Sequence, residues 1–213
     1  ASTINSSNDT INFGEVNLGA NTTIDTNATD NTGTGTLLIG AVTGGNNTLT
    51  LSTGDNFANS NMIASGNISG VTTLTLADVG GTASFSADVD VTTLTIGSTV
   101  ANVSLTGSGT SVTNAVTFGN DGTLTIGDAS GDTFTFDGGL TVSTASSTLA
   151  GSIDSTNDDI TFGAITLAAA TTLDTNASDT TGDIIIGAVT GANNNLTLDT
   201  TTSTGSADHT FTG

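Results

Sequence analysis

The sequence predicts an all-β protein that folds as a β-solenoid, and three observations support this prediction. The chain consists mainly of Thr, Val, Ile, Gly, Asn, Ser and Asp, which favour strands and turns. Most strong helix formers are missing, because the chain has no Lys or Arg, no Gln and a single Glu, Glu15. Apolar and small polar residues alternate with period two between turns rich in glycine and asparagine.

A long internal repeat is the clearest feature of the chain. The segment from residue 10 to residue 51 resembles the segment from residue 159 to residue 198. Ile11 aligns with Ile160 and Ile24 aligns with Leu173, an offset of 149 residues in both pairs. Residues 1–66 are thus similar to residues 150–213, and each copy consists of strand-and-turn units.

A shorter period lies inside the long one. Segments resembling Leu-Thr-Leu can be aligned at steps of 18 to 25 residues, through Ile24, Leu49, Leu74, Leu94, Val116, Phe134, Ile153, Leu173 and Leu196. Solenoid repeats run from about 20 to 45 residues, whereas a β-sandwich domain has about 100. We therefore expect one domain over residues 1–213, a right-handed parallel β-helix of about nine or ten coils with roughly 21 residues in each.

Stacked coils explain the alternation. A single coil cannot bury its apolar residues, but stacked coils pair their backbones at a spacing of about 4.8 Å and align like side chains. Ile, Leu, Val and Phe are expected to point inward, including Phe162 and Leu173, and the Thr residues between them outward. Gly, Asn and Asp are expected at the corners.

The charge of the chain limits its partners. The formal net charge is −20 and no Lys or Arg is present. Nucleic acid is excluded as a partner because nothing can neutralise its phosphates, and anionic membranes are disfavoured for the same reason. No apolar run approaches the ~20 residues of a membrane-spanning helix. Cations, basic surfaces and neutral glycans are the partners that this charge permits.

Three segments resemble a known class of repeat protein: Asp159-Ile160-Thr161-Phe162-Gly163, Thr171-Thr172-Leu173-Asp174-Thr175, and residues 191–198. They are similar to the β-helical repeat regions of large secreted bacterial surface proteins, namely filamentous-haemagglutinin-type exoproteins and autotransporter passengers. This resemblance implies an extracellular location on the bacterial surface and a rod used for adhesion or matrix building.

The predicted function is therefore structural and non-enzymatic. The chain is expected to be the rod of an extracellular filament or matrix fibre, with other copies of itself as partners in head-to-tail stacking. The alternative is an adhesin stalk or binding module, which recognises a glycan or a cell surface through one face or through its turns.

Acidic residues are the only candidates for site chemistry. Carboxylate pairs occur at Asp88/Asp90 and Asp158/Asp159, but no Arg, Lys, Tyr or Trp is available to bind sugar or tune a proton donor, so no catalytic residue and no cofactor are predicted. Calcium suits oxygen-only ligands, and the weak candidates are Asp121, Asp128, Asp132 and Asp137 in glycine-rich turns. The alternative is that these residues are solvated turn aspartates.

Thr-x-Thr pairs are frequent, and a flat ice-binding face would need many such pairs aligned in successive coils. The pairs are unevenly distributed along the chain, so such a face is not expected.

Overall fold

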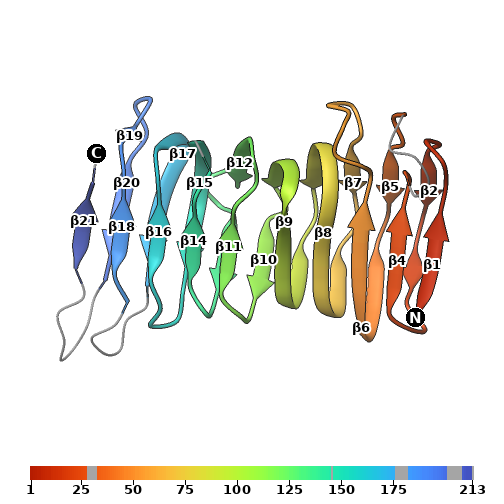
Figure 1. Ribbon diagram of the computed structural model, residues 1–213. Coiled ribbons are helices and arrows are strands. Elements are labelled where there is room, and N and C mark those ends of the chain that lie inside the picture. Colours follow the sequence, from red (N-terminus) through yellow and green to blue (C-terminus); the bar gives the residue numbers. More distant parts are fainter. Residues whose placement is uncertain (28–32, 145, 176–181, 201–207, 213) are drawn as a thin grey trace.

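The computed structural model describes residues 1–27, 33–144, 146–175, 182–200 and 208–212. Within these ranges the chain forms strands β1 to β21 and no helix. The strands stack into an elongated rod, with β1 at one end and β21 at the other (Figure 1). The all-β solenoid predicted from composition and alternation is confirmed.

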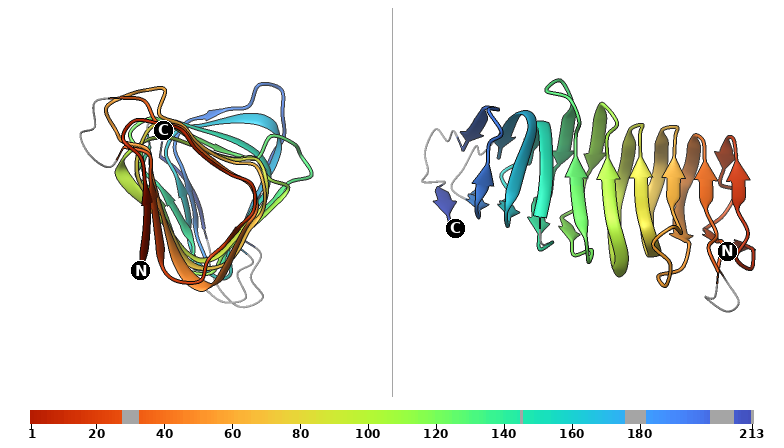
Figure 2. Two further views of the ribbon diagram at one scale, coloured as in Figure 1. Left: turned by 90° about the vertical axis from the view of Figure 1, so that its right-hand side faces the viewer. Right: turned by 90° about the horizontal axis from the view of Figure 1, so that it is seen from above.

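The rod has a three-sided cross-section when viewed along its axis (Figure 2). Face 1 contains β1 (Ser2–Asn5), β4 (Thr22–Asp25), β11 (Val116–Phe118), β14 (Leu140–Val142), β16 (Ile160–Phe162), β18 (Ile184–Ile186) and β21 (His209–Phe211). Face 2 contains β2 (Ile11–Phe13), β5 (Leu37–Ile39), β7 (Met62–Ala64), β12 (Thr123–Ile126) and β19 (Val189–Thr190). Face 3 contains β3 (Val16–Asn17), β10 (Gly109–Val112), β13 (Thr133–Phe136) and β20 (Leu196–Asp199).

Some longer strands bend round a corner and contribute to more than one face. They are β6 (Val42–Ser52), β8 (Ile68–Phe85), β9 (Val89–Leu105), β15 (Ser146–Asp154) and β17 (Ile165–Asp174). Because these strands connect the faces, most of the rod is one continuous 16-stranded sheet. The strands β11, β14, β16, β18 and β21 form a separate five-stranded sheet on face 1.

All pairings between these strands are parallel, as expected for stacked coils. The inward residues that pair between coils correct part of the series predicted from Ile24 to Leu196. Two runs of partners are confirmed, Leu49–Leu74–Leu94 and Phe134–Ile153–Leu173. Val116, however, lies on face 1 and pairs with Leu140, whereas Phe134 lies on face 3. The predicted step from Val116 to Phe134 therefore passed from one face to another and made the coils too short.

The rod has about eight turns of about 23 residues. Each turn is thus slightly longer than the roughly 21 residues expected from the sequence. The predicted partners are wrong by two residues at both ends of the ladder. Ile24 pairs with Leu51 and not with Leu49, and Leu173 pairs with Leu198 and not with Leu196.

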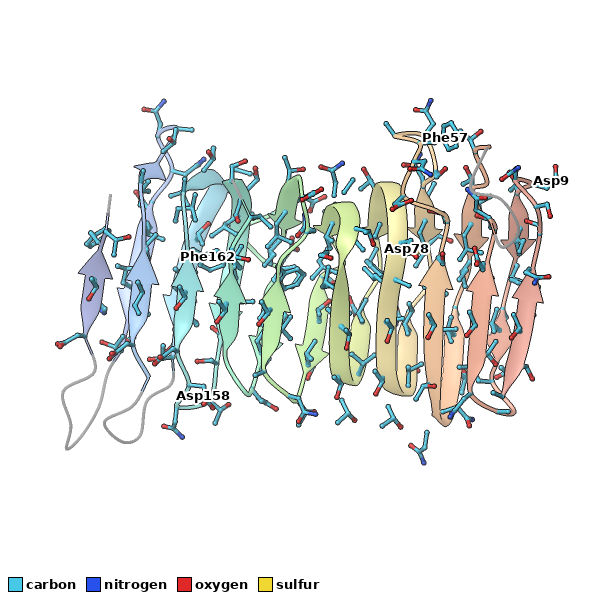
Figure 3. All side chains as sticks on the ribbon, in the orientation of Figure 1. Asp9, Phe57, Asp78, Asp158 and Phe162 are labelled. Carbon is cyan, nitrogen blue, oxygen red and sulfur yellow. The ribbon has the colours of Figure 1, made fainter. Side chains whose placement is uncertain are left out.

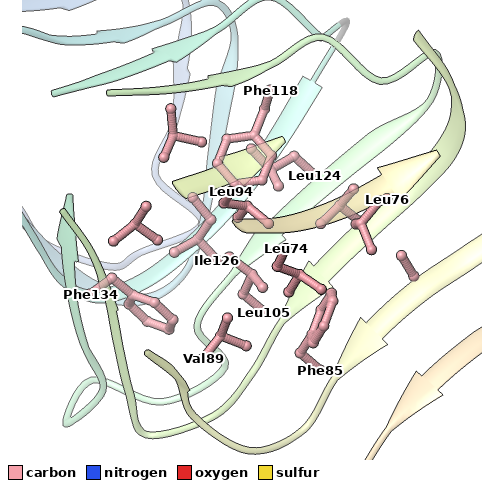
Figure 4. Close-up of a cluster of buried hydrophobic side chains, with 14 of the residues drawn as sticks. Leu74, Leu76, Phe85, Val89, Leu94, Leu105, Phe118, Leu124, Ile126 and Phe134 are labelled. Carbon is pink, nitrogen blue, oxygen red and sulfur yellow. The ribbon is translucent and has the colours of Figure 1, made fainter. Parts of the chain in front are cut away.

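The core is a continuous column of apolar side chains from the three faces. Figure 4 shows part of it, with Leu74 and Phe85 of β8 converging with Leu94 of β9 and Phe134 of β13. Phe118 and Phe136 make an edge-to-face contact with their ring centroids 6.2 Å apart. Phe162 is 1% exposed and Leu173 is fully buried, so the inward positions predicted for both are confirmed.

One corner depends on a glycine. Gly151 lies between the face-2 and face-3 parts of β15, where the register with β17 shifts, and its φ is +81°. A Cβ atom at this position would lie 2.4 Å from the backbone oxygen of Asp132. The left-handed backbone and the close approach of the neighbouring coil both require glycine here.

The two copies of the long repeat occupy different faces. Phe13 lies on face 2 and its counterpart Phe162 lies on face 1. Ile24 lies on face 1 and its counterpart Leu173 lies on face 3. The repeated unit is therefore a strand with its corner, and not a set of complete turns.

Candidate functional site

The four predicted calcium residues lie in three separate turns. Asp121 is exposed in the corner after β11, Asp137 directly follows β13, and only Asp128 and Asp132 share a loop, between β12 and β13. In that loop a carboxylate oxygen of Asp132 accepts the backbone N–H of Asp128 at 3.0 Å and that of Ala129 at 2.9 Å. The Asp132 carboxylate thus closes its own turn.

Asp137, another of the four candidates, also has a structural partner. The Thr156 hydroxyl donates to a carboxylate oxygen of Asp137 at 3.1 Å. Among the described residues, no three or more acidic or histidine side chains gather closely enough to hold a metal ion. Calcium binding stays a prediction, and the structure brings together only two of its four residues.

The carboxylate pair Asp158/Asp159 lies on the edge between face 3 and face 1. Figure 3 shows Asp158 at the lower edge of the rod, pointing away from the ribbon. Asp159 accepts the backbone N–H of Asp183 at 3.0 Å, and Asp183 accepts that of Asp208 at 2.9 Å. Each of these carboxylates therefore binds the next coil and stabilises the stack.

The pair Asp88/Asp90 has a similar arrangement. Asp88 accepts the backbone N–H of Gly109 in the next coil at 2.7 Å. Burial raises the pKa of the Asp90 carboxyl, the nearby Asp88 charge raises it further, and a hydrogen bond from the Ser111 backbone lowers it. The two aspartates therefore differ in role: Asp88 stabilises the stacking of coils, whereas Asp90 lies on the outer surface of face 3.

Two shallow clefts lie along the edge between face 3 and face 1. The first is lined by Asn46, Gly70, Val71, Thr72, Asp90, Val91, Thr92, Ser111 and Thr113. The second is lined by Ala115, Val116, Thr117, Gly138, Gly139, Leu140, Thr141, Asn157, Asp158 and Asp159. Hydroxyl groups, carboxylates and backbone line both clefts, so their chemistry suits neutral polar ligands.

Face 3 carries a column of carboxylates near the C-terminal end of the rod. Asp154 pairs with Asp174, and Asp174 pairs with Asp199. Burial raises the pKa of the Asp154 carboxyl; a hydrogen bond from Ser152 lowers it, and the charge of Asp174 raises it. Like charges stacked in register are destabilising, so this column weakens the stack at neutral pH.

The outward row of face 1 is an almost unbroken column of threonines, called here the threonine column. It consists of Thr3, Thr23, Thr50, Thr75, Thr95, Thr117, Thr141, Thr161, Ile185 and Thr210. A second column lies two residues earlier on three successive coils, where Thr48 pairs with Thr73 and Thr73 pairs with Thr93. We call the six residues Thr48, Thr50, Thr73, Thr75, Thr93 and Thr95 the threonine net.

Sequence reasoning aligned the three Thr-Leu-Thr segments around Leu49, Leu74 and Leu94 but missed the full threonine column. The Thr-x-Thr pairs are visible in the sequence, but the coils differ in length. Thr50 and Thr75 are 25 residues apart, whereas Thr75 and Thr95 are 20 residues apart, yet both pairs are in register. The rest of the column becomes visible only once the lengths of the corners are known.

The threonine column is interrupted by a seam between β9 and β11, which belong to different sheets. A cleft at this seam is lined by Thr93, Leu94, Thr95, Ile96, Ser98, Ala115, Thr117 and Gly119. The Asn114 side-chain amide donates to the Thr93 hydroxyl at 2.8 Å on one side of this cleft. The net therefore ends at a hydroxyl-lined step in the face.

Comparisons with known proteins give no indication of function, so the function is inferred from the geometry of the rod. No protein-family model, no curated protein and no solved structure matches this chain. The fold is that of a β-solenoid and is compatible with β-helical repeat proteins in general. No helix long and apolar enough to cross a membrane occurs among the described residues.

Proposed function

We propose that this chain is the structural rod of an extracellular bacterial filament or matrix fibre, of the filamentous-haemagglutinin or autotransporter-passenger type. It acts without enzymatic chemistry and assembles by end-to-end stacking of copies. The observation that carries this proposal is the exposed edge strand at each end of the part of the stack that the structure describes. Along β1 every residue is exposed, with Ile4 at 40%, and at the other end Phe211 is 61% exposed.

An open strand edge favours the addition of another strand. Its unpaired N–H and C=O groups are a template for pairing, and a neighbouring coil would also cover the apolar side chains at the edge. We assign a second copy of this chain as the occupant. Neither edge contains a Lys or Arg, so backbone pairing and apolar burial are the forces that would join the copies.

The order of the faces restricts how two copies can join. The chain runs from face 1 to face 2 to face 3, and both β1 and β21 lie on face 1. A coil that continues past β21 moves on to face 2, whereas another copy presents a face-1 strand first. If β1 of the second copy is released, its β2 can pair with β19 and its β3 with β20. Release of β1 therefore makes the junction continuous.

Sedimentation velocity and electron microscopy of the chain at micromolar concentration and physiological salt test this proposal. The wild-type chain should form thin unbranched fibres, and a variant that lacks residues 1–5 should assemble at least as well. Val189→Lys combined with Phe211→Lys should give short rods, because charge on an edge strand blocks pairing. Ala192→Lys, on an exposed loop residue near β19, is the control for added charge. Short monodisperse rods of the wild-type chain at all concentrations would disprove the filament.

The alternative function is an adhesin stalk or binding module that recognises a glycan or a cell surface. The two clefts between face 3 and face 1 favour it, since both offer hydroxyls and acceptor oxygens to a neutral polar ligand. Glycan-array binding that is lost in Thr72→Lys and Ser111→Lys, without any fibre formation by the wild-type chain, would support this alternative.

A further inference from the structure

We propose that the threonine net on face 1 binds crystalline water, that is, the surface of an ice crystal. This site is independent of end-to-end assembly, because it lies on the side of the rod and uses neither open edge. Five observations carry the proposal: the selection of threonine on one face, the spacing of the net, its rigid support, its free hydroxyls and its lack of charge.

Threonine is selected on face 1 beyond what strand propensity requires. The corresponding outward column of face 2 consists of Asn12, Leu38, Ile63, Ser84, Ser104, Thr125, Thr148, Thr166 and Thr190. That of face 3 consists of Asn17, Thr43, Ser69, Asp90, Ser111, Thr135, Asp154, Asp174 and Asp199. All three columns occupy the same kind of position, so β-propensity would act on them alike. Face 2 has a run of four threonines, but the nearly continuous column on face 1, with a second column beside it, requires another explanation.

The net has the geometry of a flat lattice. Residues paired between coils lie about 4.8 Å apart, and residues two apart on one strand lie about 6.6 Å apart. Side-chain ladders keep a stacked sheet flat, and the orange to green coils, which include those of the net, follow nearly the same outline in the view along the axis (Figure 2). A rectangular array of hydroxyls with these repeats is comparable to the oxygen lattice of ice.

The net is held rigidly from behind and is open in front. The inward residues between its columns are Leu49, Leu74 and Leu94, which are at most 4% exposed. Threonine itself has a restricted χ1 angle, so little side-chain entropy is lost when the net is covered. The next alternate positions along the three strands hold the small residues Ser52, Ala77 and Gly97, of which Ser52 is buried.

Most hydroxyls of the net are available; the exception is the Thr93 hydroxyl, which accepts the Asn114 side-chain amide. Within the part of the chain that the structure describes, those of Thr50, Thr75 and Thr95 make no hydrogen bond to protein. Buried corner threonines differ, since the Thr53 hydroxyl donates to the Ser60 backbone oxygen at 2.7 Å. The net therefore presents repeated methyl and hydroxyl groups that can order a layer of water.

The net also lacks the groups that other ligands need. Its six residues carry no charge in a chain of net charge −20, so an ionic partner gains nothing there. The net lies on β6, β8 and β9. Among the residues of these three strands only Phe85 is aromatic, and its ring is buried on face 2. Stacking of a sugar ring on an aromatic side chain is thus excluded on the net. A repeating neutral surface fits a repeating neutral ligand.

The test is an assay of ice-recrystallisation inhibition and thermal hysteresis with the purified full chain. We expect wild-type activity at micromolar concentration and loss of most of it in Thr75→Tyr, whose ring would stand above the centre of the net. The matched control is Thr148→Tyr, at an outward position of face 2, which should retain wild-type activity. Thermal melting by circular dichroism checks that both variants are folded, and sedimentation checks that both assemble like the wild-type chain.

Three outcomes would overturn the proposal: an inactive wild-type chain, an active Thr75→Tyr variant, or equal losses in both variants. If Thr75→Tyr does not fold, Thr75→Val replaces it, because it keeps the shape of the side chain and removes the hydroxyl. Retention of Thr75→Val activity at the wild-type level would then count against hydroxyl recognition of ice. Binding of the wild-type chain to cellulose or chitin particles without any effect on ice, and lost in the same variant, would assign the net to a crystalline polysaccharide.

Discussion

Thr26 and Thr175 occupy equivalent positions at two different corners of the solenoid. Both are fully buried, and each donates its hydroxyl to a glycine carbonyl across its corner, Thr26 to Gly35 and Thr175 to Gly182, at 3.0 Å in both cases. Thr26 follows a strand of face 1, whereas Thr175 follows a strand of face 3. The long repeat has therefore kept this hydrogen bond and moved it to another edge of the rod.

Loss of this buried hydroxyl should weaken the corner. Thr175→Val keeps the β-branched shape but leaves the buried Gly182 carbonyl without its side-chain donor, which costs about 1–3 kcal/mol. Thr172→Val is the matched control, because Thr172 lies on the strand that precedes Thr175 and points outward. Thermal melting and amide exchange near residue 175 measure the effect. Equal stability of the two variants would contradict a structural role for the hydroxyl.

Local chemistry made much of the fold predictable from the sequence. Alternation on strands such as Thr133–Phe136 identifies the inward residues, and the repeated strand-and-turn unit indicates a solenoid. The faces could not be predicted, because each corner has its own length and the repeat unit is shorter than a turn. This is why Val116 was aligned with Phe134 although the two lie on different faces.

The candidate sites were harder to predict than the fold. Asp121 and Asp137 stand in turns that resemble calcium loops, and the backbone preference of turn aspartate explains them equally well. The threonine column requires the register of every coil, and a shift of two residues, as at Ile24 and Leu51, would already misplace it. Residue types were visible in the sequence, while their alignment depended on the corners.

A glycine corner provides a second test of the structure. Gly151→Ala should destabilise the rod, because the left-handed backbone at φ +81° costs an L-residue about 1–2 kcal/mol and the new Cβ would meet the Asp132 backbone oxygen. Gly131→Ala is the control from the neighbouring coil, since no heavy atom lies within 4 Å of its added Cβ. Urea unfolding should separate the two variants clearly. A wild-type midpoint for Gly151→Ala would show that this corner is placed wrongly.

Calcium is a further case in which the structure makes a definite prediction. Since Asp128 and Asp132 are the only candidates that share a loop, and Asp132 already accepts two backbone N–H groups, we expect calcium and magnesium to stabilise the chain equally by screening its charge. Thermal melting in each salt at one ionic strength measures this. A larger shift in calcium that disappears in Asp128→Asn would instead establish a specific site.

Acid should stabilise the carboxylate column on face 3, and Asp154 is the residue that reports it. Its pKa is raised above the usual value of 3.8, first by burial and also by Asp174, against the hydrogen bond from Ser152. Between 3.8 and the higher folded-state pKa, the folded chain holds a proton that the unfolded chain has released. Stability must therefore fall as pH rises through this window, and it must recover as pH is lowered.

Asp154→Asn removes the charge and keeps an oxygen that can accept the Ser152 hydroxyl. At neutral pH this variant should be more stable than the wild-type chain, by up to about 1 kcal/mol for a like-charge pair on neighbouring strands. Below pH 3.8 the advantage should vanish, since the wild-type carboxyl is then protonated in both states. Asp128→Asn, on an exposed loop, measures the general gain from removing one negative charge. Melting curves from pH 3 to pH 7 decide the matter: if Asp154→Asn gains no more than Asp128→Asn at any pH, the stacked carboxylates do not repel one another in solution.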